Sequence, residues 1–122
     1  MKKILKRHHI SLKHASEGLL WAFTTQPNFR IHFFLSVIAI ILSIYFHITK
    51  GEMIVIFFII LIGLVAEMIN TALESMTDLI TQEWREKAKI AKDVSAGMML
   101  LTAIGAVIIA SIIFYPYITQ SL

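Results

Sequence analysis

The 122-residue chain contains no cysteine, which excludes disulfide bonds, cysteine-ligated zinc and thiol nucleophiles. Charged residues are also scarce, at 16%, whereas hydrophobic residues make up 57%. A soluble domain usually has about 25% charged and roughly 45–50% apolar residues, and a chain this small has too much surface to hide such an excess in a core. Eight phenylalanines and two tryptophans argue against disorder. The composition therefore predicts an integral membrane protein.

Long stretches without charge predict where the chain crosses the membrane. Residues 31–49 carry no charge, residues 53–66 are apolar before acids appear, and residues 94–122 carry no charge. A hydrocarbon core of ~30 Å needs about 20 such residues, and backbone in lipid must satisfy its own hydrogen bonds. We therefore expect a single domain over 1–122, with transmembrane helices at 31–49, 53–80 (including a cytosolic extension) and 94–117, and a connecting cytoplasmic segment at 81–93.

The basic residues predict the orientation. Ten of the eleven Lys and Arg residues lie before residue 31 or between residues 85 and 92, and only Lys50 lies in the first connection. The positive-inside rule places both basic regions in the cytosol. The basic N-terminus has no apolar core followed by a cleavage site, so we expect no signal peptide. The expected product is a multi-pass protein of the plasma or inner membrane with a cytoplasmic N-terminus.

Residues 1–29 mix apolar side chains with Lys, Arg and His. This composition is typical of a basic amphipathic helix on the inner leaflet, with Trp21 at the level of the headgroups. A plain positive-inside anchor without further function would have the same charge pattern. The fold class that we expect is all-α and integral to the membrane, with an N-terminal amphipathic surface helix and three transmembrane helices.

Polar residues cluster where the second span ends. At about 100° per residue, Glu67, Asn70, Thr71, Glu74 and Asp78 fall within about 100° of arc along roughly 16 Å of helix. A central acid costs roughly 2.5 to 3.5 kcal/mol on insertion scales, so such residues usually mark a functional site. Asp78 alone would also fit the point where a helix meets the cytosol, and Asn70 would fit a hydrogen bond between helices.

This acidic stripe has the residue types for metal-assisted phosphate chemistry. Carboxylates bind Mg²⁺, which in turn carries nucleotide phosphates, and a partly desolvated glutamate suits a general base. The mixed charges of 81–93 fit either a solvated connection or a set of cations for phosphates. The chain lacks Gly-x4-Gly-Lys-Ser/Thr and Gly-x-Gly-x-x-Gly loops, so a nucleotide must be held by metal, carboxylates and isolated Lys or Arg. Small residues at 102, 106 and 110 allow packing within one chain or between chains.

Two motifs carry a resemblance to a known family. Glu67-x-x-Asn70-Thr71-Ala72-x-Glu74-x-x-x-Asp78, followed by Ala91-Lys92-Asp93, resembles the small prokaryotic diacylglycerol kinase family, which includes undecaprenol kinases. Asn28-Phe29-Arg30-Ile31-His32 resembles the entry to the first span in Gram-positive-type members. The resemblance covers nearly the whole chain. It implies a homotrimeric kinase of the bilayer, without a nucleic-acid partner, that moves the γ-phosphoryl group of MgATP onto a lipid hydroxyl.

The resemblance also implies roles for individual residues. Glu67 would take the proton of the lipid hydroxyl, and Asn70 would position the reacting groups. Glu74 would bind the Mg²⁺ that bridges the ATP phosphates. Further contacts to ATP would come from Asp78, Glu83, Arg85, Lys92, Asp93 and Arg7. Contacts to the lipid substrate would come from Glu67, Arg30 and Ala96.

Gln26 departs from the family pattern, which has a glutamate two residues before the Asn of the entry segment, where it shares the metal. An amide oxygen can bind a hard cation, but without a charge its affinity should be lower. Three alternatives follow. Gln26 is a tolerated variant that binds the metal weakly, or Glu74 and phosphate hold the ion with help from elsewhere, or the protein has lost activity. We expect the first.

Other functions and substrates stay open at this stage. A small proton-coupled transporter would also use an intramembrane glutamate, although nearer the midplane and without the Lys92-Asp93 pair. An accessory membrane subunit would tolerate the loss of Glu67. Both diacylglycerol and undecaprenol present a primary hydroxyl, and the resemblance of the entry segment alone favours undecaprenol.

Overall fold

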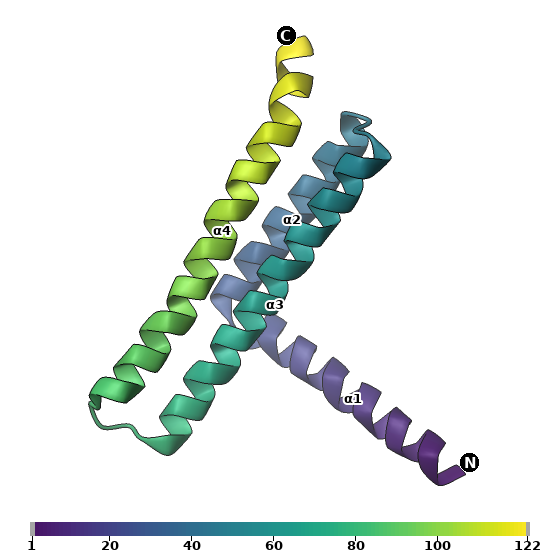
Figure 1. The fold of residues 1–122 in the computed structure, drawn as a ribbon. Helices are drawn as coiled ribbons and strands as arrows, with labels where there is room; N and C mark the ends of the chain where they lie inside the picture. Colours follow the sequence, from purple (N-terminus) through teal and green to yellow (C-terminus); the bar gives the residue numbers. More distant parts are fainter. Residues whose placement is uncertain (1, 122) are drawn as a thin grey trace.

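The computed structural model describes the backbone of residues 2–121 and the side chains of residues 11–121, and this part of the chain folds into four α-helices. They are α1 (Lys2–Thr25), α2 (Pro27–Tyr45), α3 (Lys50–Ile80) and α4 (Glu86–Gln120), as Figure 1 shows. In this part of the chain, α2, α3 and α4 are each long and apolar enough to cross a membrane. The all-helical class with three membrane-spanning candidates is thereby confirmed.

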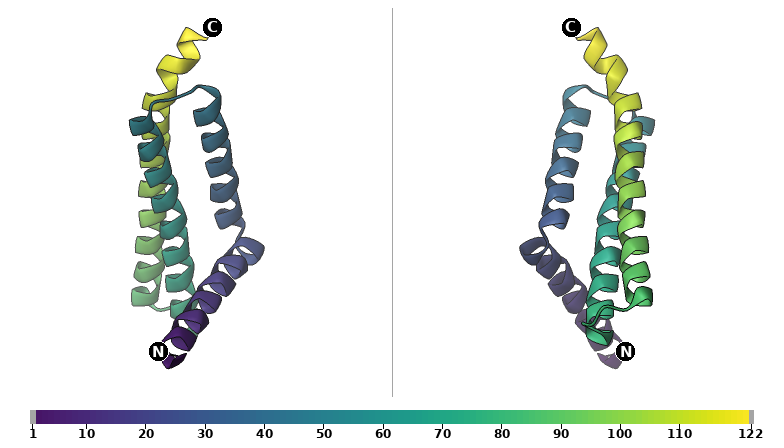
Figure 2. Two further views of the ribbon diagram at one scale, coloured as in Figure 1. Left: turned by 90° about the vertical axis from the view of Figure 1, so that its right-hand side faces the viewer. Right: turned by 90° about the vertical axis from the view of Figure 1, so that its left-hand side faces the viewer.

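The three long helices run side by side in alternating directions. Residues 46–49 join α2 to α3, and residues 81–85 join α3 to α4. The N-terminal helix α1 is inclined to this bundle, and its start lies at the same end as the 81–85 connection, whereas the C-terminus and the 46–49 connection lie at the opposite end (Figure 2). The fold therefore gathers both basic regions of the sequence at one end.

Local sequence signals explain where the helices begin. Pro27 stands in the first turn of α2, where its fixed φ is suitable and its missing N–H costs nothing, so this helix starts before residue 31. Thr49 caps α3: its hydroxyl accepts from the backbone N–H of Glu52 at 3.3 Å, and the Glu52 carboxylate accepts from the backbone N–H of Thr49 at 2.8 Å. This reciprocal pair is a capping box.

The connection between α3 and α4 is shorter than the 81–93 segment of the sequence analysis. Residues 86–93 form the first two turns of α4, which then continues through Pro116 to Gln120. The charged residues of this region therefore sit on a helix packed beside α3, and they have fixed directions relative to the acidic stripe.

The core of the bundle lies toward the 46–49 end. Its buried side chains are Ile48, Ile56, Ile113 and Phe114. Most large apolar residues on the outer faces of α2, α3 and α4 are exposed, as expected for helices that face lipid acyl chains. Near the other end, the rings of Phe23 and Phe33 meet edge to face at 5.2 Å and attach α1 to α2.

Candidate active site

The acidic stripe lies on one face of α3 and passes from the interior of the bundle to its surface. Glu67, Asn70 and Thr71 are buried, with only 2% of Glu67 exposed. One turn on, Glu74 is half-buried, and Asp78 is exposed. The stripe thus forms a continuous path from a buried carboxylate to the charged end of the bundle.

Asn70 connects this path to the neighbouring helix. Its amide nitrogen donates to the Glu74 carboxylate at 3.2 Å, and its amide oxygen accepts a hydrogen bond from the hydroxyl of Ser95 on α4 at 2.7 Å. Ser95 is buried, with 2% exposed. Asn70 therefore makes the interhelical contact that the sequence allowed and at the same time fixes one oxygen of Glu74.

Charged pairs surround the open end of the stripe. Lys92 on α4 donates to Asp78 on α3 at 2.5 Å, and the pair is partly exposed. The other two pairs in this region are Arg85 with Glu83, at 2.8 Å, and Lys89 with Asp93. Exposed ion pairs contribute only about 0–1 kcal/mol to stability, so this cluster is more notable for the charges that it presents than for holding the helices together.

Glu67 is the exception to the paired groups around it. Its carboxylate oxygen Oε2 is buried and has no hydrogen-bond partner in the described part of the chain. Burial without a partner costs a carboxylate far more than exposure does. Such a group is available to accept a proton or a hydrogen bond from a ligand that enters the site.

The remaining predicted residues lie around the junction of α1 and α2, or on α4. Gln26 stands just before α2 and donates its amide N–H to the Thr25 hydroxyl at 3.2 Å, while Arg30 donates to the backbone carbonyl of Thr24 at 3.3 Å. Neither side chain bonds to the acidic stripe within the described residues. Ala96 is exposed on α4. The side chain of Arg7 lies outside the described part.

The donor set is compatible with Mg²⁺ held mainly by its nucleotide. Between residues 11 and 121, no three His, Asp or Glu side chains converge on a common metal position. Mg²⁺ at nucleotide sites is commonly bound by one or two carboxylates, with phosphates and water completing the shell. Glu74 is half-buried, and Asn70 engages one of its oxygens, which leaves an oxygen for a cation.

Two residues of this region were absent from the sequence analysis as site candidates. Ser95 could have been found from the antiparallel arrangement of α3 and α4, in which residues equally distant from the connection lie opposite each other. Asn70 and Ser95 satisfy this condition, because their midpoint falls within the 81–85 connection. The imidazole of His32 on α2 lies within electrostatic reach of the Glu67 carboxylate. His32 was quoted only as part of the entry motif, and its proximity depends on how α2 packs on α3.

The structure defines the class first: a helical bundle with three helices long and apolar enough to cross a membrane, and with a buried carboxylate that leads to a charged end of the bundle. The chain belongs to the prokaryotic diacylglycerol kinase family, whose sequence model matches residues 13–114. This membership supports a membrane lipid kinase and does not favour a transporter.

Named relatives agree with this assignment. The chain is 41% identical over 108 residues to a diacylglycerol kinase of Synechocystis sp., an alignment that covers 88% of the chain and 62% of that relative. It is 33% identical over 112 residues to an undecaprenol kinase of Bacillus subtilis, and this alignment covers 92% of the chain and 91% of that relative. It is 32% identical over 106 residues to a diacylglycerol kinase of Haemophilus influenzae, and this alignment covers 86% of the chain and 90% of that relative. The chain thus spans less than two thirds of the Synechocystis relative and about nine tenths of the other two.

Proposed function

We propose that this chain transfers the γ-phosphoryl group of MgATP to the hydroxyl of a membrane lipid alcohol. The observation that carries the proposal is the buried oxygen of Glu67, which has no hydrogen-bond partner among the described side chains. Asn70 lies about one helical turn further along α3 and bonds to Glu74, about two turns from Glu67. A lipid alcohol reaches this depth from the bilayer, while ATP approaches from the charged end. The acidic stripe connects the two.

In the proposed reaction, Glu67 accepts the hydroxyl proton as the lipid oxygen attacks the γ-phosphorus. The bond between that phosphorus and the bridging oxygen of ATP breaks, and ADP leaves. Asn70 keeps Glu74 in place through its hydrogen bond, and Glu74 would hold Mg²⁺. The bound ion would neutralise charge on the phosphates. Phosphoryl transfer depends chiefly on such positioning and charge stabilisation.

The charged end would bind the nucleotide. Lys92 and Arg85 offer cations there, each now paired with a carboxylate of the same region. Phosphates would compete for these cations, while Asp78 and Glu83 would set their positions. Asp93 would contact ATP beside them. We assign Arg7 to the same nucleotide site from its place in the family resemblance, and Gln26 as a weak second ligand to the metal.

Membrane placement follows from the same arrangement. We propose that α1 lies on the cytoplasmic leaflet and that the 81–85 end of the bundle faces the cytosol, because the Lys and Arg residues gather there. The protein would act as a homotrimer in the plasma or inner membrane. Arg30 and Ala96 would contact the lipid substrate.

The substrate is a lipid with a primary hydroxyl. Relatives carry the names of both diacylglycerol kinase and undecaprenol kinase, so both lipids are candidates. We propose undecaprenol as the preferred substrate, on the resemblance of the Asn28–His32 entry segment to Gram-positive-type members.

The test is phosphate transfer from MgATP by purified protein in mixed micelles, with diacylglycerol and undecaprenol offered separately. Glu67→Gln should lower transfer to a small residual rate, because an amide cannot accept the proton. Glu17→Gln, on the exposed side of α1, is the matched control and should retain it. Full transfer by folded Glu67→Gln, or none by the wild type with either lipid at high Mg²⁺, would refute the proposal.

A further inference from the structure

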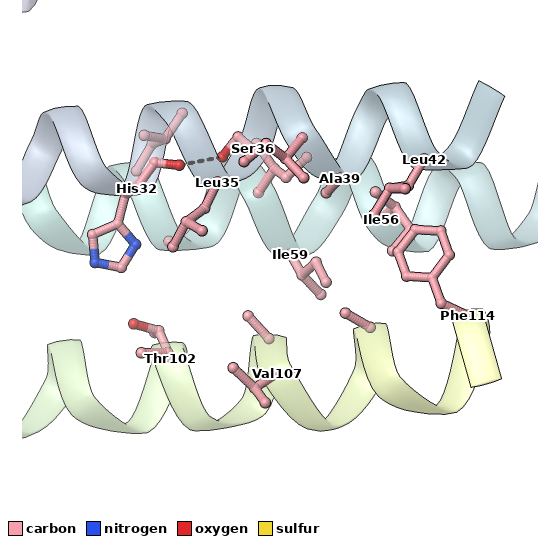
Figure 3. Close-up of a pocket in the computed structure, with 17 residues that line it drawn as sticks. His32, Leu35, Ser36, Ala39, Leu42, Ile56, Ile59, Thr102, Val107 and Phe114 are labelled. Carbon is pink, nitrogen blue, oxygen red and sulfur yellow. Dashed lines mark hydrogen bonds between the residues drawn. The ribbon is translucent and has the colours of Figure 1, made fainter. Parts of the chain in front are cut away.

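A cavity of about 320 Å³ lies between α2, α3 and α4, and His32 stands at one end of it (Figure 3). Its lining is apolar apart from His32, Ser36 and Thr102. Ser36 donates its hydroxyl to the His32 carbonyl at 2.7 Å, and Thr102 donates to the Met99 carbonyl at 2.9 Å. Both hydroxyl protons are thus used within their own helices. The His32 ring makes no hydrogen bond in the described part of the chain.

The His32 ring faces the turn of α3 that precedes Glu67. A Cβ placed on Gly63, one turn before Glu67, would lie 3.9 Å from His32 Nδ1. Because Gly63 has no side chain, the ring can approach the backbone of that turn. The imidazole and the Glu67 carboxylate are near enough to interact electrostatically.

Helix geometry directs the two side chains toward each other. In an α-helix, side chains lean toward the N-terminus of their own helix. The helices α2 and α3 run in opposite directions (Figure 2), so Glu67 leans over the turn of Gly63 while His32 leans toward Glu67. At this point the Glu67 carboxylate has a buried oxygen without a hydrogen-bond partner among the side chains of residues 11–121. The imidazole has an N–H that makes no hydrogen bond to the same residues.

We propose that His32 is a positioning residue for Glu67. Its ring N–H donates to the unpaired carboxylate oxygen and thereby leaves the other oxygen directed at the lipid hydroxyl. The bond requires rotation about the side-chain torsions of the two residues, and the NMR measurement below tests for it. The proposal rests on the proposed kinase function, and it connects the acidic stripe of α3 to a residue of α2.

The experiment compares His32→Leu, which removes the donor, with His32→Gln, which keeps an N–H donor. Ser36→Ala is the matched control, because it alters the same cavity one turn further along α2. Misplacement of a reacting group by about 1 Å can cost about 10²-fold in rate. We therefore expect His32→Leu to lower kcat by about 10- to 10²-fold with unchanged KM for ATP, His32→Gln to recover part of this loss, and Ser36→Ala to match the wild type.

A double variant separates positioning from a merely structural role. If His32 acts through Glu67, His32→Leu causes no further loss of the residual transfer in the Glu67→Gln background. The proposal is overturned if His32→Leu keeps the wild-type kcat, if it changes only the KM for lipid, or if its effect is undiminished in the Glu67→Gln background.

A second measurement does not depend on kinase activity. In protein with ¹⁵N-labelled histidine, the ring resonances of His32, assigned from their absence in His32→Gln, should shift in Glu67→Gln and not in Glu17→Gln. If the His32 resonances are unchanged in Glu67→Gln, the contact between His32 and Glu67 is overturned, even if the wild-type protein transfers phosphate normally. Shifted resonances in a protein that transfers no phosphate support the contact, and the failure then belongs to the proposed function. This readout also decides the matter if His32→Leu does not fold.

Discussion

At Asn70, a single amide bonds both across the helix interface and to a carboxylate of the proposed metal site. Its oxygen accepts from Ser95 across the α3–α4 interface, and its nitrogen donates to Glu74. An amide orientation is fixed when donor and acceptor sides each have a partner of the right kind. The helix contact therefore determines which oxygen of Glu74 is engaged and which is left for a cation.

Replacement of Ser95 tests this dual role. Ser95→Ala leaves the buried Asn70 oxygen without its donor, and hydrogen bonds between membrane helices contribute on average about 0.6 and at most about 1.7 kcal/mol. We expect a loss of that size in the free energy of unfolding by detergent, together with a lower kcat, because Asn70 is no longer held. Ser111→Ala is the control: Ser111 is exposed and bonds only to the carbonyl of Val107 in its own helix. Equal stability and kcat in the two variants would contradict the dual role.

Gln26 offers a second test at the level of a single residue. Its amide N–H bonds to Thr25, which leaves the amide oxygen as its possible ligand atom. Gln26→Glu adds a negative charge and should tighten the apparent Mg²⁺ affinity, measured by titrating transfer activity with the ion. Gln120→Glu, at the far end of the bundle, controls for added charge. A metal titration that Gln26→Glu leaves unchanged would count against a ligand role.

Among the elements, α3 and α4 are joined at both ends by polar contacts. At the end opposite the site, the hydroxyl of Tyr117 on α4 donates at 2.6 Å to the Glu52 carboxylate, which also accepts from Thr49 in the capping box. One carboxylate thus fixes both the start of α3 and the last turns of α4. This contact is separated from Glu67 by the apolar core, so it should influence stability without influencing chemistry.

Tyr117→Phe tests that separation. Loss of a hydrogen bond to a charged group destabilises the folded state, so we expect a lower free energy of unfolding and a lower midpoint of thermal unfolding. The kcat and the KM for ATP should not change. Tyr115→Phe, two residues earlier with an exposed ring, should leave the midpoint unaltered. A fall in kcat in Tyr117→Phe would show that the two ends are coupled.

The sequence predicts the elements better than their contacts. Charge-free runs indicated three long helices, and the periodicity of Glu67, Asn70, Glu74 and Asp78 placed them on one face, because both signals are local to a single helix. Partners on other helices were harder to find. Ser95 bonding to Asn70 and His32 facing the turn of Gly63 depend on the register and rotation of antiparallel helices, which hydropathy does not fix.

Across the whole molecule, the arrangement of charge and the depth of the site depend on each other. The basic residues gather at the end where α1 begins and where 81–85 connects α3 to α4 (Figure 1). The acidic stripe opens toward that same end. ATP is found in the cytosol, so the proposed function requires the positive-inside orientation.

The absence of cysteine allows a direct test of orientation. His47→Cys in the first connection, Gln82→Cys in the second and Ser121→Cys after α4 each introduce a single thiol. With a membrane-impermeant maleimide on intact cells, positions 47 and 121 should be labelled, and position 82 only after permeabilisation. The reverse pattern would place the open end of the stripe outside the cell, away from ATP, and the proposed phosphate donor would then fail. Labelling of 47 and 82 from the same side would show that α3 does not span the membrane, and Glu67 would lose the buried setting that its role as a base requires.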